Sequence, residues 1–321
     1  MSSEVSRRQL VEDGVRLATG MAALGMQATA TNVAEAQGAI AKSGFGFVHI
    51  TDTHIQPERG AQEGVEKAFA AIAKLPEKPA FGLVGGDLVM DAALVPRDRA
   101  DKVYDMWRGA AEKLKLPLHY SIGNHDLYGL KNAGTLTDAQ AADPEYGKGM
   151  WKKRLGLEQS YNSFDHQGWR FVTLDSTGIT KDADWEGVLD TEQIKWLDDL
   201  LRRTPKTMPM IFLTHFPIFT IINQYSAGTT IPLSPGMVVK NGKTFFEMTQ
   251  NHNVKAVFQG HTHVVEEVTY LGTHYITGGA VCGDWWKGKR FGVHPEGFVV
   301  AKVSGDVLSW RYVPYGWKAR S

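Results

Sequence analysis

The sequence predicts an α/β fold, and three observations support this prediction. Up to residue 126, short apolar runs alternate with helix-like runs, which is the order typical of a sheet covered by helices. From Val264 onward, almost every segment looks like a strand. The 321 residues, 43% of them hydrophobic, are enough for one large domain or two small ones with an ample core.

The first half of the chain has the pattern β-α-β-α-β. Strands are expected where apolar runs of strand length occur, at residues 45–50, 80–87 and 116–126. Helices are expected over residues 64–75 and 101–115, because apolar residues recur there at helical spacing. Residues 127–160 have little periodicity and several Gly, Asp and Lys residues, so we expect an irregular excursion or partial cap there.

The second half begins with a predicted hairpin over residues 160–176. An amphipathic helix is expected at 191–203, with Thr191 as its N-cap. Residues 219–243 are rich in Gly, Pro, Ser and Thr and are expected to form a loop. The remaining strands are predicted at residues 208–217, 254–263, 264–272, 273–279, 297–305 and 307–316.

The first 36 residues differ from the rest of the chain. Arg7 and Arg8 precede a stretch from Leu17 to Ala34 that carries no charged side chain, and small residues follow it. This resembles a twin-arginine export signal with a cleavable end. It predicts export by the twin-arginine machinery, a periplasmic or secreted protein, and a mature domain over residues 37–321. The alternative is an amphipathic surface helix, because the acidic Glu12 and Asp13 are unusual so close to the arginine pair.

Composition excludes several classes of protein. The formal net charge is zero and no basic block stands out, so we expect no nucleic-acid polymer as a partner. The leading apolar stretch is too short and too rich in Ala and Gly for a stable membrane span, and no later segment looks transmembrane. Cys282 is the single cysteine, which excludes an internal disulfide framework and favours a small buried apolar role for that side chain.

Polar side chains stand at the ends of five predicted strands. In chain order these residues are Asp52 and His54, Asp87, Asn124 and His125, His215, and finally His261 and His263. In open α/β sheets, ligands bind outside the carboxyl ends of the strands. We therefore expect these side chains to converge at one edge.

The residue types at these strand ends indicate a metal site. Two carboxylates, an amide oxygen and several imidazoles suit zinc, manganese or iron, and they do not suit an all-oxygen calcium site. A glycine precedes Asp87, Asn124 and His261, which lets the backbone turn sharply and leaves room for a bulky centre. Each motif is a weak signal alone, but five in this order predict a metal centre.

The motifs D-x-H, G-D, G-N-H-[DE], H and G-H-x-H, in this order, resemble those of the calcineurin-like metallophosphoesterases. The resemblance covers roughly residues 45–313. It implies a four-layer α/β/β/α sandwich and two metal ions (Fe, Mn or Zn) at the sheet edge. It also implies the ligands: Asp52, His54, Asp87 and His263 for one ion, and Asp87 as a bridge to a second ion held by Asn124, His215 and His261.

The resemblance implies a separate role for His125, which would face the substrate phosphate with Asn124 and protonate the leaving oxygen. In several branches of the family, the residue three positions after the bridging aspartate is diagnostic. Here it is Met90, which excludes the iron-binding tyrosine of purple acid phosphatases and cannot hold His125 in place. Asp91 or Asp126 is the expected substitute, so we count both among the catalytic candidates.

The segment "GGDLVMDAAL" contains no arginine, although protein phosphatases place one there to grip a doubly charged monoester. A site without it suits a singly charged diester better. The stretches "HITDTH" and "LDTEQIKWLDDLL" with "IFLTHFP" resemble most the bacterial cyclic-nucleotide and glycerophosphodiester phosphodiesterases, although Phe216 stands where these often have a second histidine. We therefore expect a phosphodiesterase on such a small diester. The alternatives are a phosphomonoesterase, nucleotidase or pyrophosphatase, and a metal-loaded binding protein without turnover.

Loops at the strand ends should form the substrate pocket. In "CGDWWKGKRFGVHPEG", Trp285 and Trp286 lie beside Lys287, Lys289 and Arg290, and could stack a ring and hold a second anionic group. The alternative is that both tryptophans pack this loop against the sandwich. A further candidate for a substrate contact is His294.

Overall fold

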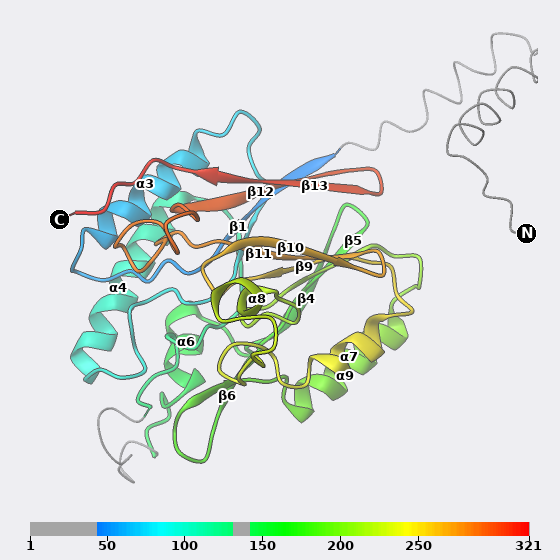
Figure 1. Ribbon diagram of the computed structural model, residues 1–321, viewed down its shortest axis with the longest axis horizontal. Helices are drawn as coiled ribbons and strands as arrows, with labels where there is room; N and C mark the ends of the chain where they lie inside the picture. The colour runs from blue at the N-terminus through cyan, green and yellow to red at the C-terminus, as the bar shows by residue number, and fades with distance from the viewer. Residues whose placement is uncertain (1–43, 131–141, 321) are drawn as a thin grey trace, which may run out of the picture. The chain divides into compact units, whose positions relative to one another are not determined.

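Figure 1 shows the computed structural model, which describes residues 44–130 and 142–320. The predicted export signal over residues 1–36 lies outside the described residues, so export and cleavage remain predictions. In the described part of the chain, no helix is long and apolar enough to span a membrane.

The first sheet has five strands. Its order is β13 (Val307–Pro314), β12 (Gly297–Ser304), β1 (Phe45–Ile50), β2 (Gly82–Val84) and β3 (Leu118–Tyr120). β1, β2 and β3 run parallel, while β12 pairs antiparallel with β1 at a register that sets Val48 opposite Val300. β2 and β3 are shorter than the apolar runs that predicted them, because the chain leaves the sheet before it reaches the polar residues.

Three helices cover the outer face of this sheet: α3 (Ala61–Ala73), α4 (Arg97–Leu114) and α6 (Lys148–Leu155). Their buried faces pack with Val48 and Ile50 of β1, and Trp107 and Trp151 are among the large side chains in this layer. α6 was missed in the predicted excursion over 127–160. Its sequence KGMWKKRL has no amphipathic period, and only Met150 and Trp151 are buried.

The second sheet has six strands. Its order is β10 (Val265–Tyr270), β11 (Thr273–Gly278), β9 (Val254–Gln259), β8 (Met210–Leu213), β5 (Trp169–Thr173) and β4 (Asn162–His166). The neighbours β11, β9, β8 and β5 are parallel, and β4–β5 is the predicted hairpin. A separate short hairpin is formed by β6 (Thr177–Ile179) and β7 (Trp185–Gly187).

Two helices cover the outer face of the second sheet: α7 (Thr191–Arg203) and α9 (Gly242–Thr249). Asp190, and not Thr191, is the N-cap of α7, because its carboxylate accepts a hydrogen bond from the Gln193 N–H at 2.7 Å. The loop predicted over 219–243 contains the short helix α8 (Ile222–Ser226) and the first residues of α9.

The inner faces of the two sheets pack on each other. Alternation along the strands sends Phe47 of β1, Ile211 of β8 and Phe258 of β9 into this layer, while their sequence neighbours face the helices. Phe47 stacks on Phe81 with ring centroids 5.4 Å apart. In Figure 1, α3 lies on one side of the pair of sheets, and α7 and α9 lie on the other. The predicted four-layer α/β/β/α sandwich is confirmed.

Candidate metal centre

The structure brings all seven predicted metal ligands together. They follow the carboxyl ends of β1, β2 and β3 in the first sheet and of β8 and β9 in the second. Six are almost fully buried and His261 is partly exposed. Short distances between their ligand atoms show that these polar side chains converge at the edge where the strands of both sheets end.

Four of these side chains form a first group. The Nε2 atoms of His54 and His263 lie 3.1 Å apart. His54 Nε2 is 3.3 Å from Asp87 Oδ2, and His263 Nε2 is 3.3 Å from Asp52 Oδ1. Two imidazole nitrogens and two carboxylate oxygens that converge in this way match the donor set of a borderline divalent metal.

A second group shares one atom with the first. Asp87 Oδ2, which is close to His54, also lies 3.3 Å from His215 Nε2. His215 Nε2 is 3.1 Å from Asn124 Oδ1, and ligand atoms of Asp87, His215 and His261 all lie within 4.8 Å of one another. Asp87 is therefore placed to bridge two neighbouring ions.

Three of the histidines are oriented by backbone carbonyls. His215 Nδ1 donates to Gly85 O at 2.8 Å, His261 Nε2 to Gly236 O at 2.9 Å, and His263 Nδ1 to Gly283 O at 2.6 Å. With that proton assigned, the other nitrogen of each ring carries a lone pair that is free to bind a metal. Carbonyl partners of this kind are typical of metal-binding histidines. The residues thus fit the two ions that the family resemblance implies.

Backbone strain marks the same residues. Asp52, His54, Asp87, His261 and His263 have φ values of 54°, 39°, 51°, 70° and 61°, in the left-handed region that non-glycine residues rarely adopt. The preceding glycines provide the room that this geometry needs. A Cβ on Gly123 would lie 2.1 Å from Asp87 Oδ1, and one on Gly260 would lie 2.6 Å from Asp52 Oδ2.

The centre favours an ionised bridging carboxylate. Burial acts to raise the pKa of Asp87, but the imidazoles of His215, His125 and His54 outweigh burial and hold this pKa well below its usual value. The His125 backbone N–H also donates to Asp87 Oδ1 at 2.9 Å. Asp87 is thus fixed in orientation and charged, as a bridging ligand requires.

His125 faces the centre from its rim. Its ring lies 4.8 Å from that of His54, and its Nδ1 lies 3.7 Å from Asp91 Oδ2. Burial acts to lower the pKa of His125, but the carboxylates of Asp87 and Asp91 raise it above the usual value. Asp91 is the group that can orient this imidazole.

Asp126 does not contact the imidazole, which corrects the expectation that it could hold His125. Its carboxylate is fully buried and accepts hydrogen bonds from the backbone N–H groups of Leu88 at 2.8 Å and Gly123 at 2.9 Å. Burial, with a contribution from Asp87, raises the pKa of Asp126 to about 7. Asp126 therefore ties together the chain segments that follow β2 and β3 through their backbone N–H groups.

The two adjacent tryptophans have different environments. Trp286 is fully buried: its Nε1 donates to His54 O at 3.0 Å, and its ring packs on Trp317 at 5.5 Å. Trp286 is therefore a core residue, and its predicted contact with substrate is wrong. Trp285 lies at the site, because its ring centroid is 4.6 Å from that of His263. The Arg290 guanidinium lies 4.9 Å from the centroid of the Trp285 ring.

Other residues near the centre were less visible in the sequence. Trp185, on β7, lies 5.7 Å from His125, ring to ring, and no strand-end pattern pointed to it. His294 accepts a hydrogen bond from the Val265 N–H at 3.1 Å, so one of its nitrogens supports the fold. Cys282 is buried as expected, with its Sγ 3.7 Å from His263 Nδ1.

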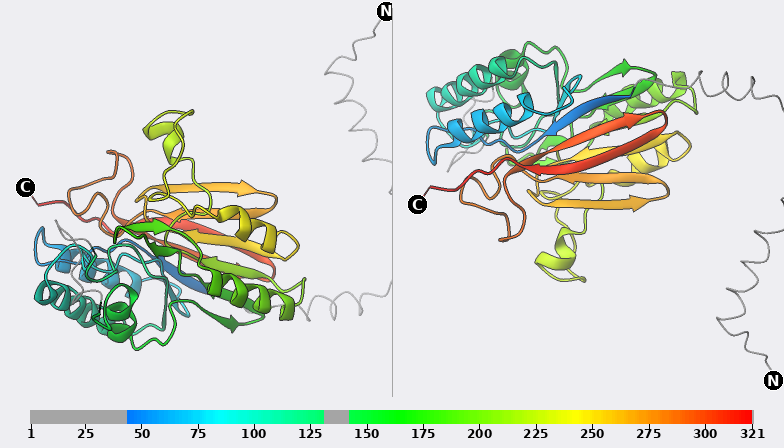
Figure 2. Two further views of the ribbon diagram at one scale, coloured as in Figure 1. Left: turned by 90° about the horizontal axis from the view of Figure 1, so that it is seen from below. Right: turned by 90° about the horizontal axis from the view of Figure 1, so that it is seen from above.

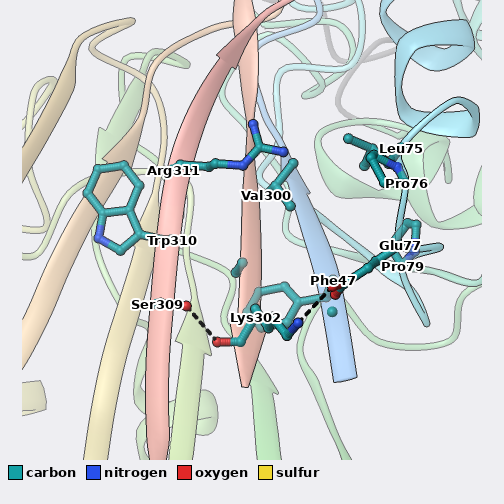
Figure 3. A pocket seen from close by; sticks show the side chains of 12 residues that line it. Phe47, Leu75, Pro76, Glu77, Pro79, Val300, Lys302, Ser309, Trp310 and Arg311 are labelled. Carbon is teal, nitrogen blue, oxygen red and sulfur yellow. Dashed lines mark hydrogen bonds and ion pairs between the residues drawn. The ribbon is translucent and has the colours of Figure 1, made fainter. Parts of the chain in front are cut away.

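A groove lies at the opposite end of β1 (Figure 3). It is bordered by Phe47, by the loop after α3, and by the segment of β12 and β13 that includes Arg311. Within it, Lys302 Nζ donates to Glu77 Oε1 at 2.8 Å. None of the predicted metal ligands lines this groove, so it is distinct from the metal centre.

Comparison with known proteins agrees with this geometry. A model of the calcineurin-like phosphoesterase family matches residues 45–265. The chain is 27% identical over 253 residues to "Serine/threonine-protein phosphatase CPPED1" of Bos taurus, covering 77% of this chain and 71% of that protein. The protein of the same name from Homo sapiens is 26% identical over 250 residues, with the same coverage.

The fold is also similar to that of a solved dimetal phosphatase from Danio rerio. The TM-score is 0.59 at 16% identity, and the alignment covers 85% of this chain and 96% of that one. At this identity the likeness shows the fold alone. The family match spans both groups of ligands up to His263, and so the chain belongs to the calcineurin-like phosphoesterase family as a metal-dependent phosphoric ester hydrolase.

Proposed function

We propose that this enzyme is a dinuclear phosphodiesterase that hydrolyses a small diester, such as a cyclic nucleotide or a glycerophosphodiester. The observation that supports this proposal is the pair of aromatic rings beside the ligands: Trp285 against His263 and Trp185 against His125. Arg290 is close, but its charge is engaged by Asp284 at 2.8 Å. Such a rim suits a singly charged ester with organic groups on both sides better than a doubly charged monoester.

The ligands named above would hold two ions of Fe, Mn or Zn. When bound, these ions supply positive charge for the phosphoryl oxygens and activate water near neutral pH. The chain itself orients the ligands through Gly85, Gly236 and Gly283, whose carbonyls accept the spare imidazole protons. It also excludes bulk water from Asp52 and Asp87, which are fully buried.

In the proposed reaction, a water oxygen forms a bond to phosphorus while the bond from phosphorus to one alcohol oxygen breaks. His125 Nε2 gives its proton to that departing oxygen, and the proton lost by water restores the imidazolium. Asp91 holds the opposite side of the ring, 3.7 Å from Nδ1. The products are an alcohol and a phosphomonoester, and both groups stay on one molecule when the diester is cyclic.

A comparison of substrates tests this proposal. Purified enzyme is assayed with bis-nitrophenyl phosphate and with nitrophenyl phosphate, before and after chelation. The proposal requires a higher kcat/KM for the diester and loss of both activities on chelation. A preference for the monoester would overturn the diester assignment, while activity that survives chelation would overturn the metal mechanism itself.

Phosphomonoesterase activity is the second possibility, because both curated relatives carry the name of a protein phosphatase. The same pair of substrates decides between the two. A protein that binds metal but turns over neither substrate would instead be a metal-loaded binding protein.

We also propose that the chain is exported by the twin-arginine machinery and acts in the periplasm or outside the cell. The support is the sequence pattern after Arg7 and Arg8. Cell fractionation of the full chain and of Arg7→Lys/Arg8→Lys tests it. Export of the wild type alone is expected, and equal export of both would contradict the proposal.

A further inference from the structure

We propose that two loops beside the metal centre form a docking surface for an anionic lipid bilayer. The loops are residues 219–239, which include α8, and residues 284–294, between β11 and β12. We call them the docking loops. This proposal goes beyond the choice between diester and monoester, because it concerns where the enzyme works and is tested by binding.

The first docking loop is exposed and uncharged. From Phe219 to Val239 the sequence contains no Asp, Glu, Lys or Arg. Three large apolar side chains on it are open to solvent: Ile221 is 40% exposed, Tyr225 49% and Ile231 50%. A long surface segment without charges costs solubility, so such a loop indicates contact with an apolar partner.

The second docking loop combines apolar and cationic side chains. Phe291 and Val293 are 47% and 66% exposed, and the exposed Lys287 and Lys289 precede them on the same turn. The Arg290 guanidinium lies 4.3 Å from the centre of the Phe291 ring. Apolar side chains that can insert between headgroups, flanked by lysines, are the signature of binding to an anionic interface.

The two docking loops form one surface. The Tyr225 ring lies 5.9 Å from that of Phe291 and 6.5 Å from that of His294. Both views of Figure 2 show the segment with α8 (yellow-green) and the segment between β11 and β12 (orange) projecting from the same side of the strands. Of the nine large hydrophobic side chains exposed on the described residues, five belong to these loops.

The docking loops are also continuous with the metal centre. His261 donates to Gly236 O in the first loop, and His263 donates to Gly283 O immediately before the second. A bilayer seated on the loops would therefore lie beside the centre, and phosphoesters displayed at that bilayer would reach it without leaving the interface.

The charge pattern favours a lipid surface over a protein partner. The formal net charge of the chain is zero, so its attraction to an acidic surface must be local. That local charge is positive at Lys287 and Lys289, and the first docking loop contributes no carboxylate to oppose it. Anionic lipid headgroups are mobile in the bilayer and can gather beside these lysines, whatever the shape of the docking loops. A protein partner would instead need acidic residues at matching fixed positions.

Vesicle flotation tests the proposal. The full chain is mixed with vesicles of phosphatidylcholine alone, or of phosphatidylcholine with phosphatidylserine, and the floated fraction is measured. We expect flotation with the mixed vesicles and little with phosphatidylcholine alone. Lys287→Gln/Lys289→Gln should bind about fivefold more weakly for each lysine removed, and Phe291→Ser/Val293→Ser should lose most of the binding.

Matched controls separate docking from folding and catalysis. Leu271→Ser removes a side chain that is 76% exposed on the β10–β11 turn, and Lys74→Gln/Lys78→Gln removes two exposed lysines near the end of α3. These variants should float like the wild type. Phe291→Ser/Val293→Ser and the two control variants should hydrolyse a soluble nitrophenyl ester at the wild-type rate, so failure of docking is distinguishable from failure of the proposed function. A wild type that stays soluble with every vesicle would overturn the proposal in favour of a protein partner, and unchanged flotation of Phe291→Ser/Val293→Ser would overturn the role of the loops.

Discussion

The strand ends that carry the metal ligands and the docking loops beside them are built in opposite ways. At the strand ends, five ligands adopt left-handed backbone angles and the side chains are almost all buried. In the docking loops, Ile231 and Val293 are at least half exposed. The strained strand ends hold the ligands in a fixed geometry, which a catalytic metal centre needs. The docking loops leave apolar side chains open to solvent, which binding to a membrane surface needs. Catalysis and membrane binding thus belong to two different regions of the enzyme.

The largest effect should come from the bridging ligand. Asp87→Ala removes the carboxylate shared by both groups of ligands, so kcat/KM should fall by at least about a thousandfold. Elemental analysis should show loss of metal from the same protein. Asp98→Ala, which removes an exposed carboxylate on α4, is the control and should leave kcat/KM and metal content unchanged. Substantial activity in Asp87→Ala would contradict the claim that catalysis depends on the ligands at the strand ends.

The next effect concerns the rim of the centre. His125→Ala should lower kcat about a hundredfold on a diester with an alkyl leaving group, because the departing oxygen then lacks its proton donor. The loss should be smaller with a nitrophenyl leaving group, which departs without a proton. Metal content should remain near that of the wild type, and loss of metal would contradict the role assigned to His125.

The adjacent tryptophans test the contrast within one loop. Trp286→Ala should lower the free energy of unfolding by about 3–5 kcal/mol, since it empties a fully buried site. Trp285→Ala should change stability by less than about 1 kcal/mol, because its ring is partly exposed. Urea unfolding of both variants gives the comparison. Equal destabilisation would show that both rings are structural.

The smallest effects belong to groups that act on substrate or on His125 indirectly. Asp91→Asn should reduce kcat about tenfold without loss of metal, because it weakens the orientation of the imidazole. Its pH–rate profile should shift as well, which a purely structural role would not produce. Trp285→Ala should raise KM for aromatic diesters more than for alkyl diesters, and an equal rise for both would argue against stacking.

The sequence predicted the layers of the fold and the convergence of the candidate metal ligands, because both depend on local patterns. Apolar runs end at polar residues, and β-α-β connections bring those ends to one edge, so residues as distant as Asp52 and His263 could be placed together. The prediction was weaker for side chains whose burial is decided by tertiary packing. Trp285 and Trp286 are identical in type and adjacent, and only packing against Gly64 and Trp317 sends Trp286 into the core.

Other features left no local signal. Asp91 and Asp126 were equal alternatives as partners of His125, and the choice depended on which carboxylate the backbone N–H groups of Leu88 and Gly123 already occupied. Trp185 reaches His125 from a hairpin that no periodicity indicated. The docking loops escaped notice because a stretch without charges looks like an ordinary loop until its side chains are seen to be exposed.

Anomalous diffraction from crystals grown with manganese would test the two-ion centre most directly. Two peaks about 3.5–4 Å apart are expected, the first in contact with His54 and His263, the second with Asn124 and His215, and both with Asp87. A single peak, or peaks remote from Asp87, would contradict the account.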